Sequence, residues 1–199
     1  MLGLLGIGGR CVPRGSGPYF RNVGVLSPAT GHTGAVDLEL RPIRSGDGSV
    51  LHGLVAHPEV WEWLTPAGSR GPAALAQCAA WARRDAAHWE LHGFGKWLVF
   101  EDGTPVGRGG LNVTFLDGRP EVEVGWAVAR ENWGRGIATE IARASLDEAG
   151  RLGLRGVVAF SRPENHASLR VIEKSGLARE RELDHAGRPH ILFRAEAHA

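Results

Sequence analysis

The residues from Glu121 to Thr139 read EVEVGWAVARENWGRGIAT, and they are the most informative part of this sequence. An apolar run at 122–128 leads into two glycines, Gly134 and Gly136, placed one residue apart. Glycine allows a tight turn and lets a ligand approach the backbone without meeting a Cβ. Backbone amides at the start of a helix have no partner inside it and carry the positive end of the helix dipole. The stretch therefore predicts a strand, a turn and a helix start that binds a phosphate.

The residues that follow predict a helix, a strand and a second helix. Residues 135–149 are amphipathic, with apolar side chains on one side and charged ones on the other. The run LRGVVAF (154–160) is typical of a buried strand. In NHASLRVIEKSGL (165–177), Asn165 is a good N-cap and Gly176 suits the position after the last helical turn. These segments complete a strand–helix–strand–helix unit.

Further strands and helices surround this unit. Asp-Gly pairs in EDGTP and LDGRP predict hairpin turns between three successive strands. The remaining elements that we expect are a strand at 38–43, helices at 49–57, 58–64 and 73–92, strands at 96–101, 105–115 and 121–128, and closing strands at 177–184 and 188–196. The buried stripe of the 73–92 helix is expected at Leu75, Cys78, Ala82, Ala86 and Trp89. This order predicts an α/β chain with one central mixed sheet.

Composition restricts the class of protein and its partners. The 199 residues suit one domain at 37–199, with residues 1–36, rich in Gly, Pro, Ser and Thr, as a flexible N-terminal extension. The net charge is only +1 and no run of basic residues is present, which argues against nucleic acid as a partner. No apolar stretch is long enough to span a membrane, and Cys11 and Cys78 suggest no disulfide framework. We therefore expect a cytoplasmic monomer or homodimer that binds neither nucleic acid nor membrane.

The segment 121–149, taken together with NHASLRVIEKSGL, resembles the coenzyme-A core of the GNAT acyltransferases. The branch it resembles most is the RimJ/RimL-like group, which includes ribosomal-protein N-terminal acetyltransferases. The resemblance covers roughly residues 37–195, and one departure is Glu131, where the superfamily often has Gln or Arg. It implies a GNAT-like α/β (α+β) fold whose central mixed, mostly antiparallel sheet has about seven strands flanked by helices.

The resemblance also implies acetyl-CoA as co-substrate and no metal. A pyrophosphate needs several convergent N–H donors, which a turn at a helix N-terminus provides. The residues expected there are Trp133, Gly134, Arg135, Gly136, Ile137 and Ala138. The alternative is a tight turn that binds nothing. The amide-bearing arm of the co-substrate is expected to pair with a strand edge formed by Trp126, Ala127 and Val128. Asn165 would contact the arm from the other side or serve as a helix cap only, and the two roles are compatible.

Transfer of an acetyl group to an amine requires a base, since an ammonium group has no lone pair. Glu123 is the candidate, because related enzymes often carry a base at this place on the strand. The alternative is an ordinary solvent-facing carboxylate beside Glu121. Ser168 is the candidate partner of the departing thiolate, by resemblance to the RimJ/RimL-like branch, whereas many other members use a Tyr there. A backbone N–H near Ala127 is expected to meet the developing oxyanion.

Two further features leave alternatives open. His88 and His92 lie four residues apart on a predicted helix and could bind a metal, but HWELH is not an HExxH motif and a solvated or partly packed pair is the better interpretation. Trp61 and Trp63 either line an acceptor pocket or pack in the core.

The expected function is an N-acetyltransferase that moves an acetyl group from acetyl-CoA to a primary amine by direct attack in a ternary complex. The amine belongs to a protein N-terminus or to a small molecule, and the sequence leaves this open. The first alternative is a non-catalytic acyl-CoA-binding sensor or interaction module. A more distant one is a nucleotide-binding protein that uses the same turn.

Overall fold

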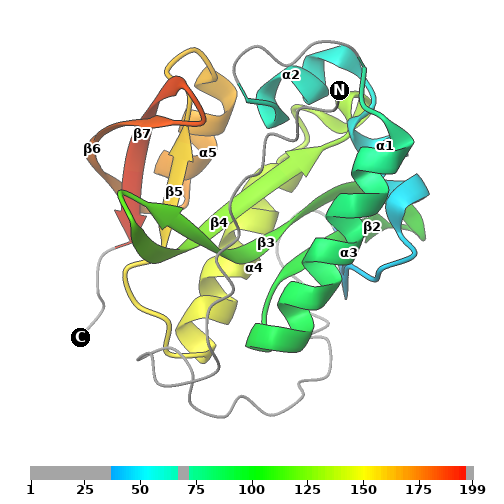
Figure 1. The fold of residues 1–199 in the computed structure, drawn as a ribbon, viewed down its shortest axis with the longest axis horizontal. Helices are drawn as coiled ribbons and strands as arrows, with labels where there is room; N and C mark the ends of the chain where they lie inside the picture. Colours follow the sequence, from blue (N-terminus) through cyan, green and yellow to red (C-terminus); the bar gives the residue numbers. More distant parts are fainter. Residues whose placement is uncertain (1–36, 67–71, 196–199) are drawn as a thin grey trace, which may run out of the picture.

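The computed structural model of this chain describes residues 37–66 and 72–195 (Figure 1). The extension predicted at 1–36, which includes Cys11, lies outside the described residues. The helices are α1 (Gly48–Val55), α2 (Pro58–Leu64), α3 (Leu75–His92), α4 (Ile137–Arg151) and α5 (His166–Lys174), with a short 3₁₀ helix, η1 (Arg130–Asn132), before α4. The strands are β1 (Glu39–Pro42), β2 (Lys96–Glu101), β3 (Thr104–Leu116), β4 (Arg119–Val128), β5 (Val158–Ser161), β6 (Leu177–His185) and β7 (Arg188–Ala195).

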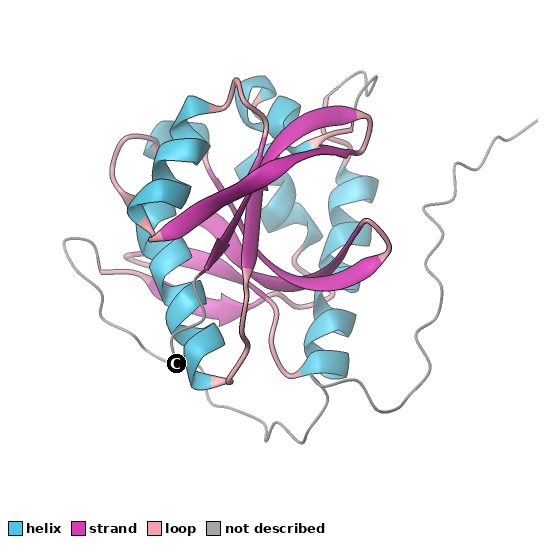
Figure 2. Cartoon of the chain, turned by 90° about the vertical axis from the view of Figure 1, so that its left-hand side faces the viewer, coloured by secondary structure: helices cyan, strands magenta, loops and turns pink. Residues whose placement is uncertain are grey.

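Within the described residues, seven strands form one mixed sheet in the order β1-β2-β3-β4-β5-β7-β6. Neighbouring strands are antiparallel except for β4 and β5, which are parallel. Helices lie on both faces of this sheet (Figures 1 and 2). The predicted fold class is confirmed. The run predicted as a strand at 154–160 is strand only from Val158, so β5 is shorter than its apolar pattern indicated.

Tight turns connect the strands of the first hairpins. Asp102 and Gly103 have φ angles of +48° and +73°, and Asp117 and Gly118 have φ angles of +49° and +76°. Positive φ at both central residues is the signature of a type I′ turn, whose twist matches that of the flanking strands. The two Asp-Gly turns predicted from the sequence are therefore confirmed, and they place β2, β3 and β4 side by side.

Helix α4 covers one face of the sheet, and α1 and α3 cover the other (Figure 1). Ile141 of α4 approaches β3 where glycine leaves room: a Cβ at Gly109 would lie 2.3 Å from the Cγ2 of Ile141. On the opposite face, Leu51 of α1 and Cys78 of α3 belong to one buried core with Ala127 of β4. Strand β4 is thus packed from both sides, which holds the start of α4 at a fixed place.

The stripe predicted for α3 is only partly correct. Leu75 is 54% exposed, because it is the first residue of the helix and lies one turn before the first buried position. Cys78 and Ala82 are buried as expected, and Asp85 completes their row. Positions i, i+4 and i+7 share one helix face, so the carboxylate is carried into the interior by the same periodicity that buries its apolar neighbours.

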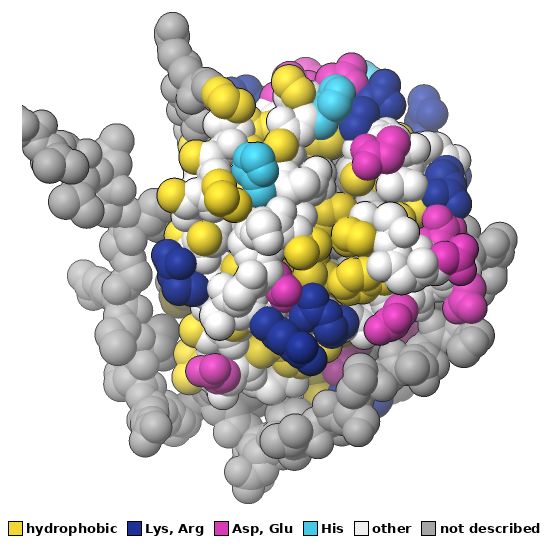
Figure 3. Space-filling view, turned by 90° about the vertical axis from the view of Figure 1, so that its right-hand side faces the viewer, with side chains coloured by type: hydrophobic (Ala, Val, Ile, Leu, Met, Phe, Trp, Pro, Cys, Tyr) yellow, Lys and Arg dark blue, Asp and Glu magenta, His cyan; other side chains and the backbone are white. Residues whose placement is uncertain are grey.

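The surface on the side of α1 and α3 carries acidic and basic side chains interspersed with apolar ones (Figure 3). No helix in the described ranges has both the length and the apolar character needed to cross a membrane.

Candidate active site

The sheet is interrupted between β4 and β5. Strand β4 pairs with β3 along its length and ends with Val128 opposite Gly107. With β5, the described residues pair at one position, Glu123 opposite Val158. The last residues of β4, 126–128, therefore have one edge without a partner strand. These are the residues for which the resemblance implies pairing with an amide-bearing arm.

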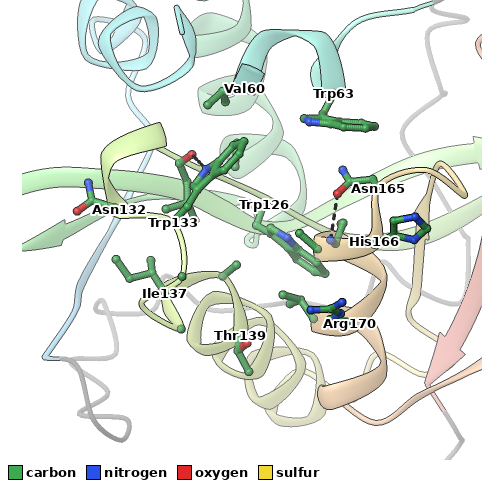
Figure 4. Close-up of a pocket in the computed structure, with 18 of the residues that line it drawn as sticks. Val60, Trp63, Trp126, Asn132, Trp133, Ile137, Thr139, Asn165, His166 and Arg170 are labelled. Carbon is green, nitrogen blue, oxygen red and sulfur yellow. Dashed lines mark hydrogen bonds between the residues drawn. The ribbon is translucent and has the colours of Figure 1, made fainter. Parts of the chain in front are cut away.

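A cavity of about 640 Å³ opens at this edge (Figure 4). Four segments that are far apart in the sequence line it: α2, the end of β4, the turn before α4 with the first turn of that helix, and α5. The predicted co-substrate residues that line it are Trp126, Ala127, Val128, Trp133, Gly134, Gly136, Ile137, Ala138 and Asn165. Ser168 lines it as well, whereas Arg135 and Glu123 do not.

The glycine turn leaves its backbone open to the cavity. Gly134 and Gly136 have φ angles of +78° and +84°, and a Cβ built on either would meet no atom within 4 Å. Gly136 is the N-cap of α4 and no side chain caps this helix. In the described part of the chain, the backbone amides from Gly134 to Ala138 find no hydrogen-bond acceptor. These free amides, at the positive end of α4, can receive an anion.

Two side chains hold this turn in place. Trp133 folds back so that its Nε1–H donates to the carbonyl oxygen of Val128 at 2.9 Å, and the guanidinium of Arg130 lies 4.7 Å from the centre of its ring. Arg135 points away from the cavity and forms an ion pair with Glu101 of β2 at 2.7 Å. Trp133 thus ties the turn to the end of β4, and the side chain of Arg135 ties it to β2.

Helix α5 begins as the sequence predicts. The side-chain Oδ1 of Asn165 accepts a hydrogen bond from the backbone N–H of Ser168 at 3.0 Å, so the cap interpretation is confirmed (Figure 4). The face of α5 that lines the cavity continues through Arg170 and Lys174, which sequence reasoning did not assign to the site. Arg170 and Lys174 are four residues apart, on the side of the helix away from the buried Ile172. This spacing was the signal in the sequence that they share one face.

Glu123 lies on the sheet face that α1 and α3 cover, since it shares that face with Ala127. Its Oε2 accepts a hydrogen bond from the Nδ2 of Asn112 at 3.1 Å. Glu121, the other carboxylate considered as a base, forms a two-fold ion pair with Arg194 at 2.9 and 3.0 Å. The structure therefore distinguishes the two: Glu121 is paired with a cation, and Glu123 is held by a neutral amide beside the position where β4 and β5 separate.

Charged groups gather on the same face near Glu123. Burial lowers the pKa of Lys96 to about 8, with Arg108 acting in the same direction and the charge of Glu123 acting against it. Arg108 is buried next to Asp85, their closest atoms 3.8 Å apart, and Nη1 of Arg108 and Oδ2 of Asp85 have no hydrogen-bond partner among the described residues. The sequence did not predict that Asp85 and Arg108 are buried, because a charged residue within a helix or strand pattern gives no sign of its burial.

The two tryptophans of α2 have different environments. Trp61 is buried and packs against Trp81 with ring centroids 5.3 Å apart. Trp63 lines the cavity, and the guanidinium of Arg162 lies 4.3 Å from the centre of its ring. Trp61 therefore packs in the core, and Trp63 lies at the cavity, where the pocket interpretation requires it.

The histidine pair of α3 is packed. The Nδ1–H of His88 donates to the carbonyl oxygen of Phe94 at 2.9 Å, and its Nε2 accepts from the backbone N–H of Val113 at 3.0 Å. Both ring nitrogens are thus used, and the ring of His92 lies 4.3 Å away. No group of three or more metal-ligand residues occurs among the described residues.

Comparisons with known proteins show the family and the fold of this chain. The family model of the acetyltransferase (GNAT) domain matches residues 37–178. The uncharacterized protein YkkB of Bacillus subtilis (strain 168) is 26% identical over 165 residues, which is 81% of this chain and 93% of that protein. The solved structure of AAC(6′)-Ib in complex with ribostamycin and coenzyme A superposes with a TM-score of 0.68 at 16% identity, covering 79% of this chain and 92% of that one. For the ribosomal-protein-S5-alanine acetyltransferase from Vibrio fischeri, the TM-score is 0.62 at 22% identity, with coverage of 79% and 91%.

The family match extends over more than half of the chain, and its limits enclose β4, the glycine turn and α5. This chain belongs to the GNAT acetyltransferase family. The two solved structures share its fold.

Proposed function

We propose that this protein is an N-acetyltransferase that transfers an acetyl group from acetyl-CoA to a primary amine by direct attack in a ternary complex. The observation that carries the proposal is the free edge of β4 at 126–128, which lines the same cavity as the open amides at the start of α4. A peptide-like arm can pair with a strand edge, and a pyrophosphate accepts hydrogen bonds from helix-start amides. The chain offers donors for both polar parts of one elongated ligand.

The residues present fit this co-substrate. Gly134 and Gly136 leave room where a pyrophosphate would approach the backbone, and no side chain competes for the N-terminus of α4. The likeness to a fold solved with coenzyme A adds support. When bound, acetyl-CoA supplies the acetyl group as an activated thioester.

Three groups of the chain carry the proposed chemistry. Glu123 takes a proton from the incoming ammonium group, directly or through a water molecule, so that the amine has a free lone pair. The backbone N–H near Ala127 stabilises the negative charge that develops on the carbonyl oxygen. The hydroxyl of Ser168, which lines the cavity, hydrogen-bonds the departing sulfur. No covalent intermediate with the protein is needed.

The acceptor amine belongs, in this proposal, to a protein N-terminus or to a small molecule. The RimJ/RimL-like pattern Asn165, Ser168 and Gly176 supports a protein N-terminus, as does the fold shared with a ribosomal-protein acetyltransferase. The fold shared with AAC(6′)-Ib in its ribostamycin complex supports a small amine. Trp63, at the α2 side of the cavity, is placed to contact either one.

A second candidate function is an acyl-CoA-binding sensor without turnover. The observation that favours it is that the side chain of Glu123 does not line the cavity that Ser168 lines. The sensor and the enzyme share the binding site and differ in whether an amine is acetylated.

Two measurements test the proposal. Calorimetric titration with CoA, acetyl-CoA, ATP and NAD should show binding of the two CoA species alone. A thiol-release assay with acetyl-CoA should then show turnover with at least one amine from a panel of N-terminal peptides, amino acids, polyamines and aminoglycosides. Absence of CoA binding overturns both candidate functions. Binding without thiol release for every amine supports the sensor.

A further inference from the structure

Asn112 and Glu123 form a cross-strand pair beside the site. They lie directly opposite one another in the β3–β4 register, so their side chains stand on the same face of the sheet. The Nδ2 of Asn112 donates to Oε2 of Glu123 at 3.1 Å, while the Oδ1 of Asn112 is buried and has no hydrogen-bond partner among the described residues. An ionised carboxylate can only accept, so the amide must turn its nitrogen toward Glu123 even though its oxygen is left unsatisfied.

The second carboxylate oxygen has a defined direction as well. A Cβ built on Gly125 would lie 3.3 Å from Oε1 of Glu123. The carboxylate therefore leans along β4 over the position where residue 125 has no side chain, toward the free edge at 126–128. Gly125 pairs with Gly110 on β3, so the next cross-strand row is also free of side chains on these two strands.

A cation competes for the same carboxylate. Lys96 is the β2 residue opposite Gly110, which puts it in the same row beyond the two glycines, and its charge interacts with that of Glu123. Arg108 of β3 also interacts with Glu123, although its nearest acidic partner is Asp85 of α3. Without Asn112, the carboxylate would be free to turn toward Lys96 and away from the end of β4.

We propose that Asn112 is a positioning residue: it holds one oxygen of Glu123 so that the other lies over Gly125 and faces the point where β4 and β5 separate. This inference rests on the proposed function, in which Glu123 is the base. Asn112 itself touches neither co-substrate nor acceptor.

The test uses Asn112→Ala and Asn112→Asp, with Thr114→Ala, two residues along on the same strand face, as the matched control. Asn112→Ala should bind CoA with an unchanged Kd and lose about tenfold in kcat near neutral pH, a fraction of the usual worth of a general base. Asn112→Asp places a second carboxylate opposite residue 123, and two like charges this close disfavour full ionisation of the pair, so the acidic limb of the pH–rate profile should move to higher pH. Thr114→Ala should change neither.

The double variant Asn112→Ala/Glu123→Gln separates this inference from the proposed function. If Asn112 acts through Glu123, the double variant should be no slower than Glu123→Gln alone. Losses that multiply, or an acidic limb that does not move in Asn112→Asp, would overturn the positioning role while the transferase stands. Full activity in Glu123→Gln would also overturn it. A protein that binds CoA and acetylates no amine would remove the proposed function, and this inference with it.

Discussion

The ring of His88 joins helix α3 to strand β3, because its Nε2 accepts the backbone N–H of Val113. Donation from Nδ1 to the carbonyl of Phe94 fixes the neutral tautomer. Burial, aided by the nearby His92, lowers the pKa of His88 to about 4. For this histidine pair the sequence favoured a solvated or partly packed arrangement over a metal site, and His88 is packed as a structural connection between two elements.

This connection should make stability depend on pH. Between the unfolded pKa of about 6.5 and the folded value of about 4, the unfolded chain binds more protons, so the free energy of unfolding should fall as pH decreases through this window. The expected loss is on the order of 2–3 kcal/mol for His88. Urea unfolding of wild type and His88→Gln at pH 7 and pH 4.5 measures it. The slope should flatten in His88→Gln but persist in the exposed control His57→Gln; equal slopes in all three would contradict the prediction.

Gly136→Val should weaken acetyl-CoA binding far more than it weakens folding. The branched side chain would stand where a pyrophosphate approaches the backbone, so we expect at least a tenfold rise in Kd, which is about 1.4 kcal/mol. Gly118→Val is the matched control, since Gly118 has a similar positive φ and equally open surroundings but lies in the β3–β4 turn. Both variants should lose about 1–2 kcal/mol of stability from the left-handed backbone. Equal Kd values in calorimetry would remove the phosphate-site interpretation.

Glu123→Gln keeps the shape of the side chain but cannot accept a proton. Acetyl-CoA binding should be unchanged, and kcat near neutral pH should fall by about 10²–10⁴. The loss should shrink as pH rises toward the pKa of the acceptor amine, where the free amine needs no base. Glu131→Gln, an exposed residue of η1, serves as the control in the same thiol-release assay. A loss below about threefold at every pH would show that Glu123 is not the base.

Ser168→Ala tests the partner of the leaving sulfur. Binding should be spared because the capping hydrogen bond uses the backbone N–H of Ser168, which alanine retains. Turnover should fall with acetyl-CoA and fall less with an activated aryl thioester, whose thiolate is stable without help. Ser175→Ala, at the other end of α5, is the control, since its hydroxyl bonds the carbonyl of Val171. The same deficit with both thioesters would argue against the assigned role.

Local signals made much of the fold predictable. Asp-Gly turns, the amphipathic pattern of α4 and the cap at Asn165 each depend on residues close in sequence, and each is confirmed. What the sequence could not predict depends on residues that meet only after folding. Asn112 reaches Glu123 only through the β3–β4 register, and Trp63 reaches the cavity only because α2 folds over the end of β4. The burial of Asp85 likewise requires the position of Arg108 on another element.

Strands β4 and β5 pair at a single position, Glu123 opposite Val158. The sheet therefore consists of two weakly paired blocks, one of β1 to β4 and one of β5, β7 and β6. Across this division, the blocks are joined by the ion pair of Glu121 with Arg194 and by apolar packing in a core that includes Val122, Val124 and Val157. Packing of this kind permits small relative displacements that a ladder of hydrogen bonds would resist. If the amide-bearing arm of acetyl-CoA bound along residues 126–128, it would act as an additional strand and connect the two blocks. Hydrogen exchange at these amides and the cooperativity of unfolding would then report whether the sheet behaves as two units or as one.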